Sequence, residues 1–443
     1  MIKTNLEIVK KLKKYLYNIE ERRKYIKGKN SFTRNRKMPF ELMIVFMLNM
    51  IKKTLSVELL GFYKTLEKVT QKGKKVTDLV TKSGFSQGRK KLCGEFFKSW
   101  NRVLVKEYYT DNDGRIKKWR GKRLAATDGT TLYLIDKAEI KEEFGVQRNQ
   151  TMEVPMAQVI CSYDVMNDIF LDSRIMPIAI GELQGAIDNL ESFEKDMVMI
   201  YDRAYPSFGF MYIHIKTERD FVIRAPEKFN NEIKAFSQTK LKETTVKLPA
   251  TERGKAMARE FGFKIGEDEE IEVRLIKVFL KKSTEILITS LLDKEKYPAS
   301  EFKDLYRMRW EVETSFDRLK NKLQVESFSG HSAEAIRQDF YAAIFISNLQ
   351  TLLIDECSDE VDEKSLGRKY QYAINRNVSI GLMKDRIIEI FLSSDPAKVI
   401  EDLKSEFIKF LEPIRPDRSF EHKRKSKRTK GKYQTHNNYR RSI

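Results

Sequence analysis

The chain has 443 residues and carries 84 Lys and Arg against 64 Asp and Glu, a formal net charge of +20. Hydrophobic residues make up 41% and aromatic residues 11%, which excludes a mostly disordered chain and, at this length, predicts more than one domain. Only three cysteines and four histidines occur. They argue against a disulfide framework and a thiolate or imidazole metal site, and they fit a reducing compartment.

Neither a signal peptide nor a membrane span is expected. The N-terminal stretch has no apolar run followed by small residues at a cleavage site. The longest apolar stretches, 40–51 and 341–354, are shorter than the roughly 20 residues of a membrane span and contain polar residues. The sequence therefore predicts a soluble, intracellular protein that does not contact a membrane.

The charge is concentrated at the two ends of the chain. Residues 1–120 contain 31 basic and 11 acidic residues, residues 421–443 contain nine and one, and the middle has a net charge of −8. Basic ends attract polyanions, because contact with phosphates releases counterions. This distribution favours nucleic-acid binding over a general excess of solubilising charge, and carboxylates clustered around divalent metal would explain the acidic middle.

Residues 1–112 are predicted to be helical. Ser86 is the expected N-cap of a helix whose first turns carry Arg89, Lys90 and Lys91. Several short helices that end in a basic one resemble a helix-turn-helix module. A plain helical bundle is the alternative.

From residue 123 onwards the pattern changes to strands. A short apolar run that ends at Asp202 is typical of a strand at the centre of a sheet. Residues 226–294 are rich in extended segments and predict a β-strand insertion, and a long helix is expected to begin near Ser300. The other predicted elements are strands at 123–135 and on both sides of 165–167, helices at 182–195 and 208–216, and a strand at 220–225.

The segment that begins near Ser300 carries a polar group of residues at helical spacing. On a regular helix, Tyr306, Arg309, Glu313 and Lys320 share an arc of about 60° beside an apolar stripe. This placement suits the lining of a cleft. The alternative is an ordinary Arg309–Glu313 pair four residues apart, which contributes only about 0.2–0.5 kcal/mol.

Two aspartates supply the remaining acidic groups. Asp128 follows the apolar start of a strand, and Asp202 closes another apolar strand. A carboxylate at the end of a buried strand is costly unless it is paired or bound to metal. One such aspartate is more often a turn or cap residue, so the prediction depends on the combination with Glu313. Three carboxylates make an oxygen-only site that suits Mg²⁺ or Mn²⁺, with Asp317 as a rival acid to Glu313.

The four-residue motif is informative as a whole. The spacing Tyr306-x2-Arg309-x3-Glu313-x6-Lys320 resembles the Tyr-Arg-Glu-Lys motif of bacterial transposases of the "insertion sequence four" family, which belong to the DDE class. The segments DGTTL, which begins at residue 128, and YDRAY, which begins at residue 201, are similar to the first and second aspartate motifs of that family. The similarity extends to FTRNRKMPF, GFSQGRKKL and RPDRS, so it covers most of the chain.

The resemblance implies a site and a reaction. It implies that Asp128, Asp202 and Glu313 hold two Mg²⁺ or Mn²⁺ ions, and that the family motif residues, with Arg203 as a weaker candidate, hold DNA near the cut. It also implies binding of double-stranded DNA at terminal inverted repeats, cleavage of the element ends and joining of the 3′-hydroxyl to target DNA. A homodimer in a synaptic complex and a cytoplasmic, nucleoid-associated location in a bacterium follow from the same resemblance.

The implied fold is an α/β, ribonuclease-H-like catalytic core with four additional regions. An inactive transposase-derived DNA-binding protein and a nuclease of the same fold are the alternatives. The three acids favour an enzyme, and the basic N-terminal region favours recognition of a defined DNA end. The expected regions are an N-terminal helical DNA-binding region (1–112), the core (113–225 and 295–355), the β-strand insertion (226–294), a C-terminal helical region (356–420) and a basic tail (421–443).

Overall fold

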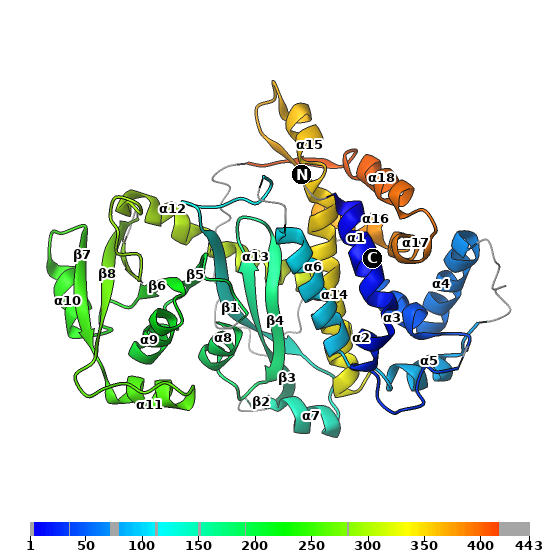
Figure 1. Ribbon diagram of the computed structural model, residues 1–443, viewed down its shortest axis with the longest axis horizontal. Helices are drawn as coiled ribbons and strands as arrows, with labels where there is room; N and C mark the ends of the chain where they lie inside the picture. Colours follow the sequence, from blue (N-terminus) through cyan, green and yellow to red (C-terminus); the bar gives the residue numbers. More distant parts are fainter. Residues whose placement is uncertain are drawn as a thin grey trace. The chain divides into compact units, whose positions relative to one another are not determined.

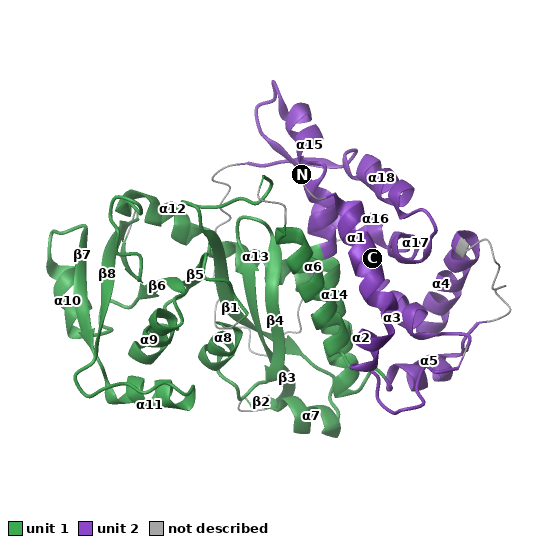
Figure 2. Ribbon diagram, viewed as in Figure 1, with its two compact units in different colours: residues 1–2, 92–320, 325–348 green, residues 3–91, 321–324, 349–443 purple. Residues whose placement is uncertain are grey.

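A computed structural model describes residues 4–34, 36–70, 79–110, 114–148, 152–190, 192–280 and 283–415 (Figure 1). The chain forms two compact units (Figure 2). Unit 1 comprises residues 92–320 and 325–348, and unit 2 comprises residues 3–91, 321–324 and 349–443. The predicted basic tail lies outside the described residues. None of the helices in the described ranges has the length and apolar character that crossing a bilayer requires.

Unit 1 is built on a mixed sheet of nine strands. The strand order is β2-β3-β1-β5-β6-β9-β8-β7, and β4 pairs with β3. Its strands are β1 (Arg123–Tyr133), β2 (Val146–Arg148), β3 (Glu153–Asp164), β4 (Ile169–Pro177), β5 (Met197–Tyr201), β6 (Asp220–Ala225), β7 (Glu243–Pro249), β8 (Glu270–Phe279) and β9 (Thr284–Thr289).

The centre of this sheet combines two kinds of pairing. β4, β3 and β1 are antiparallel to one another, whereas β1, β5 and β6 are parallel. All five residues of β5 are buried, as the apolar sequence predicts for a central strand. Parallel strands end at one edge of a sheet, so this pairing decides which side chains meet there.

Helices cover the sheet. α8 packs on β1 and β3, α13 on β1 and β3, α6 on β4, and α9 on β6. The sequence places α9 and β6 correctly, whereas the helix predicted at 182–195 ends at Leu190. The helices of unit 1 are α6 (Glu95–Tyr109), α7 (Ala138–Phe144), α8 (Glu182–Leu190), α9 (Phe208–Lys216), α10 (Asn231–Gln238), α11 (Glu252–Glu260), the 3-10 turn η2 (Ala299–Glu301), α12 (Phe302–Arg307), α13 (Trp310–Asp317) and the first part of α14 (Ala333–Asp355).

The segment predicted as a β insertion contains strands and helices. β7, β8 and β9 form an antiparallel meander, and β9 pairs with β6, so these strands extend the central sheet. The two helices α10 and α11 were not predicted. Each begins at a side-chain cap: Asn230 Oδ1 accepts from the Ile233 amide at 2.9 Å, and Thr251 Oγ1 accepts from the Gly254 amide at 3.1 Å.

The long helix predicted from residue 300 is interrupted. α12 ends at Arg307, α13 begins at Trp310, and a π-helical turn, η3 (Arg318–Lys322), follows α13. The side-chain directions predicted for one regular helix therefore do not apply along the whole segment. A π turn adds a residue to the turn and changes the direction of the side chains beyond it.

Unit 2 consists mainly of helices. All residues of α3 except Glu41 are buried, which makes this helix the core of the N-terminal part. The two short strands β10 and β11 pair with each other and were not predicted. The elements are α1 (Asn5–Tyr17), α2 (Ile19–Arg23), α3 (Phe40–Leu48), α4 (Leu55–Thr70), α5 (Lys82–Arg89), α15 (Ser358–Ser365), β10 (Tyr372–Ile374), α16 (Arg376–Met383), α17 (Arg386–Leu392), α18 (Pro396–Phe407) and β11 (Leu411–Pro413).

The predicted N-cap at Ser86 is wrong. Thr81 caps α5, because its Oγ1 accepts a hydrogen bond from the Gly84 amide at 3.0 Å. Ser86 lies inside the helix, and Arg89 is its last residue rather than part of its first turns. Lys90 and Lys91 follow the helix.

Candidate active site

Two aspartates lie just beyond the point where the parallel pairing of β1 with β5 ends. Ala126 on β1 is paired with Ile200 on β5. Two residues further along the chain, Asp128 lies within β1 and Asp202 directly follows β5. Asp128 Oδ1 accepts from the Gly129 amide at 2.9 Å, and Asp202 Oδ1 accepts from the Ala204 amide at 2.7 Å. The strand register therefore brings both carboxylates to one edge of the sheet.

Arg309 connects Asp128 with the third predicted acid. Its Nη1 lies 3.5 Å from Asp128 Oδ2, and its Nη2 donates to Glu313 Oε1 at 2.8 Å. The Arg309 side chain is only 8% exposed, whereas that of Glu313 is 39% exposed. The Arg309–Glu313 pair expected as an alternative is therefore present, and the same guanidinium also contacts Asp128.

The electrostatic environment of Asp128 is unfavourable for a charged carboxylate. The pKa of Asp128 is raised to about 6, mainly by burial and in smaller part by the nearby carboxylates of Asp202 and Glu182. The Gly129 amide and the Arg309 guanidinium oppose this rise without cancelling it. The site thus has too little positive charge for its acids.

Tyr306 and Lys320 also reach this edge. Tyr306 is buried, its ring centroid lies 5.9 Å from the guanidinium carbon of Arg309, and its hydroxyl has no hydrogen-bond partner among the described residues. Lys320 Nζ donates to Thr130 Oγ1 and to the Thr131 carbonyl, both at 2.8 Å. Arg309 and Lys320 thus contact β1 at and just after Asp128, and Tyr306 and Glu313 lie beside Arg309.

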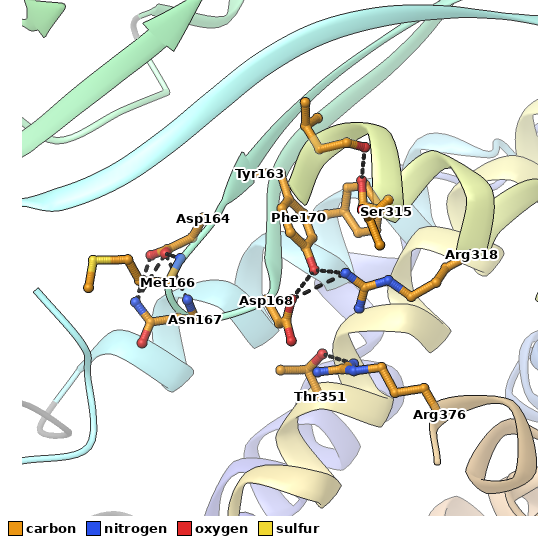
Figure 3. A network of polar contacts seen from close by, with 12 residues as sticks. Tyr163, Asp164, Met166, Asn167, Asp168, Phe170, Ser315, Arg318, Thr351 and Arg376 are labelled. Carbon is orange, nitrogen blue, oxygen red and sulfur yellow. Dashed lines mark hydrogen bonds and ion pairs between the residues drawn. The ribbon is translucent and has the colours of Figure 1, made fainter. Parts of the chain in front are cut away.

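A polar network fixes the π turn that carries Lys320 (Figure 3). Arg318 Nη2 donates to Tyr163 Oη at 2.6 Å and to Asp168 Oδ1 at 3.2 Å. Tyr163 Oη donates to the same Asp168 oxygen at 2.7 Å. Because Tyr163 lies on β3 and Asp168 in the turn to β4, the network ties η3 to the antiparallel part of the sheet.

The other predicted residues are placed differently. Arg203 is exposed beside Asp202, and the rival acid Asp317 is exposed at the end of α13. Arg89 is buried, with its guanidinium carbon 5.8 Å from the centroid of the Phe85 ring, so it is poorly placed to contact DNA. Lys90 and Lys91 are exposed.

Lys91 belongs to a cavity that the sequence did not reveal. This basic cavity, of about 540 Å³, lies within unit 2 and is lined by the exposed cations Arg34, Arg36, Lys37 and Lys91. Apolar side chains such as Phe32 complete its lining, and none of the described lining residues is acidic.

Sequence reasoning also missed Glu182 at the edge of the sheet. Glu182 is the first residue of α8, and a Cβ at Gly129 would collide with its carboxylate. Gln158 Nε2 donates to Glu182 Oε1 at 3.3 Å. A glutamate in the first turn of a helix is common, so no local signal distinguishes this one.

The carboxylate oxygens at this edge suit a hard divalent cation, although the side chains do not converge on one point. Among the described residues, no three His, Cys, Asp or Glu side chains are grouped closely enough to hold a metal ion. Asp128 and Glu313 instead lie on either side of Arg309. The carboxylate of Asp128, whose pKa is raised by burial, is nevertheless a group that Mg²⁺ or Mn²⁺ would stabilise in the ionised form.

Comparison with known proteins identifies the family. The profile of the transposase DDE domain matches residues 111–349, more than half of the chain, and the chain belongs to this family. The resemblance seen in the sequence is thereby confirmed. The family implies dependence on divalent metal in general.

Two curated relatives are similar at low identity. The chain is 27% identical to the putative transposase y4zB of Sinorhizobium fredii over 177 residues, which cover 39% of this chain and 47% of the relative. It is 22% identical to the transposase InsG for insertion sequence element IS4 of Escherichia coli over 237 residues, 52% of each chain. The chain therefore spans about half the length of these relatives.

One solved structure aligns over most of the chain. A piggyBac transposase synaptic complex with hairpin DNA covers 92% of this chain and 81% of its own, at 12% sequence identity and a TM-score of 0.39. A similarity of this degree carries no argument about the fold or the function.

Proposed function

We propose that the protein is a DNA transposase that binds terminal inverted repeats, cleaves the element ends and joins the 3′-hydroxyl to target DNA. The observation that carries this proposal is the position of Asp128 and Asp202, each two residues beyond the last parallel pair of β1 and β5, with Glu313 linked to Asp128 through Arg309. The strands β1, β3 and β4 are antiparallel to one another, and β5 and β6, which come later in the chain, run parallel to β1. This strand arrangement supports a ribonuclease-H-like core.

The carboxylates of Asp128, Asp202 and Glu313 would hold two Mg²⁺ or Mn²⁺ ions. Bound there, the ions would activate the attacking oxygen and stabilise the leaving oxygen of an in-line phosphoryl transfer. Asp128, whose pKa burial raises to about 6, would be kept ionised by this positive charge. The all-oxygen donor set supports Mg²⁺ or Mn²⁺ over zinc.

Tyr306, Arg309 and Lys320 would position the DNA and the site. In this proposal Arg309 releases the carboxylates of Asp128 and Glu313 when DNA binds. Its planar guanidinium then binds a DNA phosphate with two hydrogen bonds. The buried Tyr306 hydroxyl, which has no partner among the described residues, would donate to the same strand. Lys320 holds β1 beyond Asp128, and exposed Arg203 would contact the backbone beside Asp202.

The basic cavity of unit 2 would bind DNA away from the site of cleavage. Its four cations without acidic lining residues among those described suit phosphates, and exposed Lys90 adds to the charge next to it. The basic tail at 421–443 would add contacts of the same kind. Pairing of two DNA ends by a homodimer, and a cytoplasmic location at the nucleoid, rest on the family resemblance.

Incubation with labelled DNA tests the proposal. Wild-type protein and the Asp128→Asn variant are given a duplex that carries the element end, target DNA and Mg²⁺. Joined products that only the wild type forms would support the transposase, whereas cleavage without joining would support a nuclease. A bound but intact duplex would support an inactive DNA-binding protein, and equal cleavage by both proteins would overturn the role of Asp128.

A second variant separates catalysis from binding. Glu313→Gln removes one negative charge from the site and leaves the basic surfaces unchanged. We expect it to lose cleavage while its affinity for the duplex stays within about twofold of wild type. A parallel loss of DNA affinity would indicate a defect in folding rather than in the site.

A further inference from the structure

A fourth carboxylate reaches the same edge of the sheet from its other face. Side chains alternate along a strand, so Asp128 and Thr130 point to the face from which Arg309 and Lys320 approach. A side chain at Gly129 would point to the opposite face, where it would meet Glu182 of α8. The Glu182 carboxylate therefore lies against the backbone immediately after Asp128.

A polar contact from the neighbouring strand holds Glu182 in this place. Gln158 lies on β3 opposite Thr131 of β1, is buried, and donates to Glu182 Oε1 at 3.3 Å. The amide orients the carboxylate without supplying any charge. Glycine at position 129 provides the space that the carboxylate occupies.

The charges at this edge do not balance. The carboxylates of Asp128, Asp202, Glu182 and Glu313 lie at this edge, and among the described residues only Arg309 forms ion pairs with any of them, namely with Asp128 and Glu313. Within the part of the chain that the structure describes, no ion pair involves Asp202 or Glu182. A partly buried carboxylate without a counter-charge is costly, so the arrangement calls for additional positive charge between the two faces.

A buried hydroxyl provides a second, independent indication. Tyr205 follows Asp202 in the same turn, is 1% exposed, and its hydroxyl has no hydrogen-bond partner among the described residues. Its backbone amide donates to the Asp202 carbonyl at 3.4 Å. Burial raises the pKa of Tyr205, and the carboxylates of Glu182 and Asp128 contribute to this rise. A buried hydroxyl without a partner is unusual and indicates a group that is still to be bound there.

We propose that Glu182 is a fourth acidic ligand of the divalent-metal site, closing it from the face of the sheet opposite Arg309. The inference rests on the proposed function, because it assigns Glu182 to the same site as Asp128 and Asp202. Its ligand class is a hard divalent cation held by carboxylate oxygens. A purely structural Glu182, held for its contact with Gln158, is the alternative.

Binding of Mn²⁺ to the full chain without DNA tests the inference. Mn²⁺ titration followed by electron paramagnetic resonance gives the affinity of wild type, Glu182→Gln, Asp128→Asn and Asp188→Asn. Asp188 lies on the same helix and pairs with Arg174 at 3.6 Å, so its variant removes the same charge away from the site. We expect Glu182→Gln to weaken binding about tenfold or more, and Asp188→Asn to change it less than twofold.

The outcomes separate this inference from the proposed function. Weaker binding in Asp128→Asn with unchanged binding in Glu182→Gln would overturn the role of Glu182 and leave the three-carboxylate site standing. Unchanged binding in both would overturn the metal site itself.

Thermal unfolding without metal distinguishes a ligand from a structural residue. Glutamine has the shape of glutamate, keeps an acceptor for Gln158 and removes one uncompensated charge. Glu182→Gln is therefore expected to raise the Tm of the metal-free protein by about 2–4 °C, and to lose part of the Tm increase that Mn²⁺ gives wild type. A lower Tm with a full Mn²⁺ response would assign Glu182 to structure.

Discussion

The guanidinium of Arg309 lies 3.5 Å from the carboxylate of Asp128 and binds Glu313 as well. A single buried cation thus joins residues from a strand and from a helix that are far apart in the sequence. It contacts Asp128 Oδ2 and Glu313 Oε1, and both carboxylates belong to the proposed metal site. Arg309 and divalent metal are therefore expected to compete for the same oxygens.

Replacing Arg309 with Gln tests this competition. Without metal, Asp128 loses its cation, and the free energy of unfolding is expected to fall by about 2 kcal/mol. Saturating Mn²⁺ should stabilise the variant more than wild type, because no guanidinium has to be displaced. Urea unfolding with and without Mn²⁺ measures both effects. Arg307→Gln is the control, since Arg307 is 74% exposed, and an equal Mn²⁺ effect in Arg309→Gln and wild type would contradict the competition.

The raised pKa of Asp128 predicts how stability changes with pH. Burial shifts this pKa from 3.8 to about 6, so the folded state holds the proton more tightly than the unfolded state does. Stability is therefore lost as pH rises from about 4 to about 6, and the loss amounts to about 3 kcal/mol. Asp128→Asn cannot ionise. The metal-free variant should be more stable than wild type at pH 8 and of equal stability near pH 4.

Urea unfolding of both proteins from pH 4 to pH 8, without metal, measures this difference. Glu153→Gln serves as the control, because Glu153 is an exposed carboxylate of the same sheet. A stability difference between Asp128→Asn and wild type that stays constant over the whole range would show that ionisation of Asp128 is not its cause.

The sequence was sufficient for the elements whose signal is local. β5 is a short apolar run, and the aspartate that follows it was placed correctly at a strand end. The motif residues were grouped by spacing, and the structure brings them to the same edge. Glu182 was not found, because its position depends on the packing of α8 against Gly129 and on the pairing of β1 with β3.

Tertiary contacts also explain the wrong predictions. The segment from residue 300 has a continuous helical pattern, yet Arg318 is held by Tyr163 and Asp168, and a π turn forms there. Ser86 and Thr81 are both good N-caps by composition. Thr81 starts α5, so that Phe85 lies within the helix, where it is buried with its ring centroid 4.9 Å from that of Phe46. Such long-range contacts cannot be inferred from local propensity.

The basic cavity predicts a specific loss of DNA binding. Each contact with a phosphate contributes about 0.9 to the slope of log affinity against log salt. Arg36→Glu with Lys91→Glu should therefore weaken duplex binding and lower that slope by about two. Lys10→Glu with Lys11→Glu, two exposed positions on α1, is the matched control. Fluorescence anisotropy at several salt concentrations measures the slopes, and equal changes in the two double variants would rule out a special role for the cavity.

Buried Arg89 should behave differently from its neighbours. Because its side chain packs beside Phe85, Arg89→Gln is expected to lower the Tm and to leave the salt slope of DNA binding unchanged. Lys90→Gln, at an exposed position, is the comparison for the same charge change. If Arg89→Gln lowered the slope by about one with an unchanged Tm, Arg89 would have to reach DNA in the bound state.

Lys320 is expected to act on catalysis through β1. Lys320→Met keeps the length of the side chain and removes both of its hydrogen bonds, to Thr130 Oγ1 and to the Thr131 carbonyl. A small displacement of β1 near Asp128 should reduce single-turnover cleavage on the order of 100-fold. Lys303→Met, at an exposed position on α12, is the control and should cleave like wild type.

A double-mutant cycle with Thr130→Val identifies the route of this effect. Thr130→Val alone removes one partner of Lys320 and should cause a smaller loss of cleavage. If Lys320 positions β1, adding Thr130→Val to Lys320→Met should reduce the rate no further, because the contact is already gone. Independent, additive losses would instead assign Lys320 to the DNA strand, where the threonine hydroxyl plays no part.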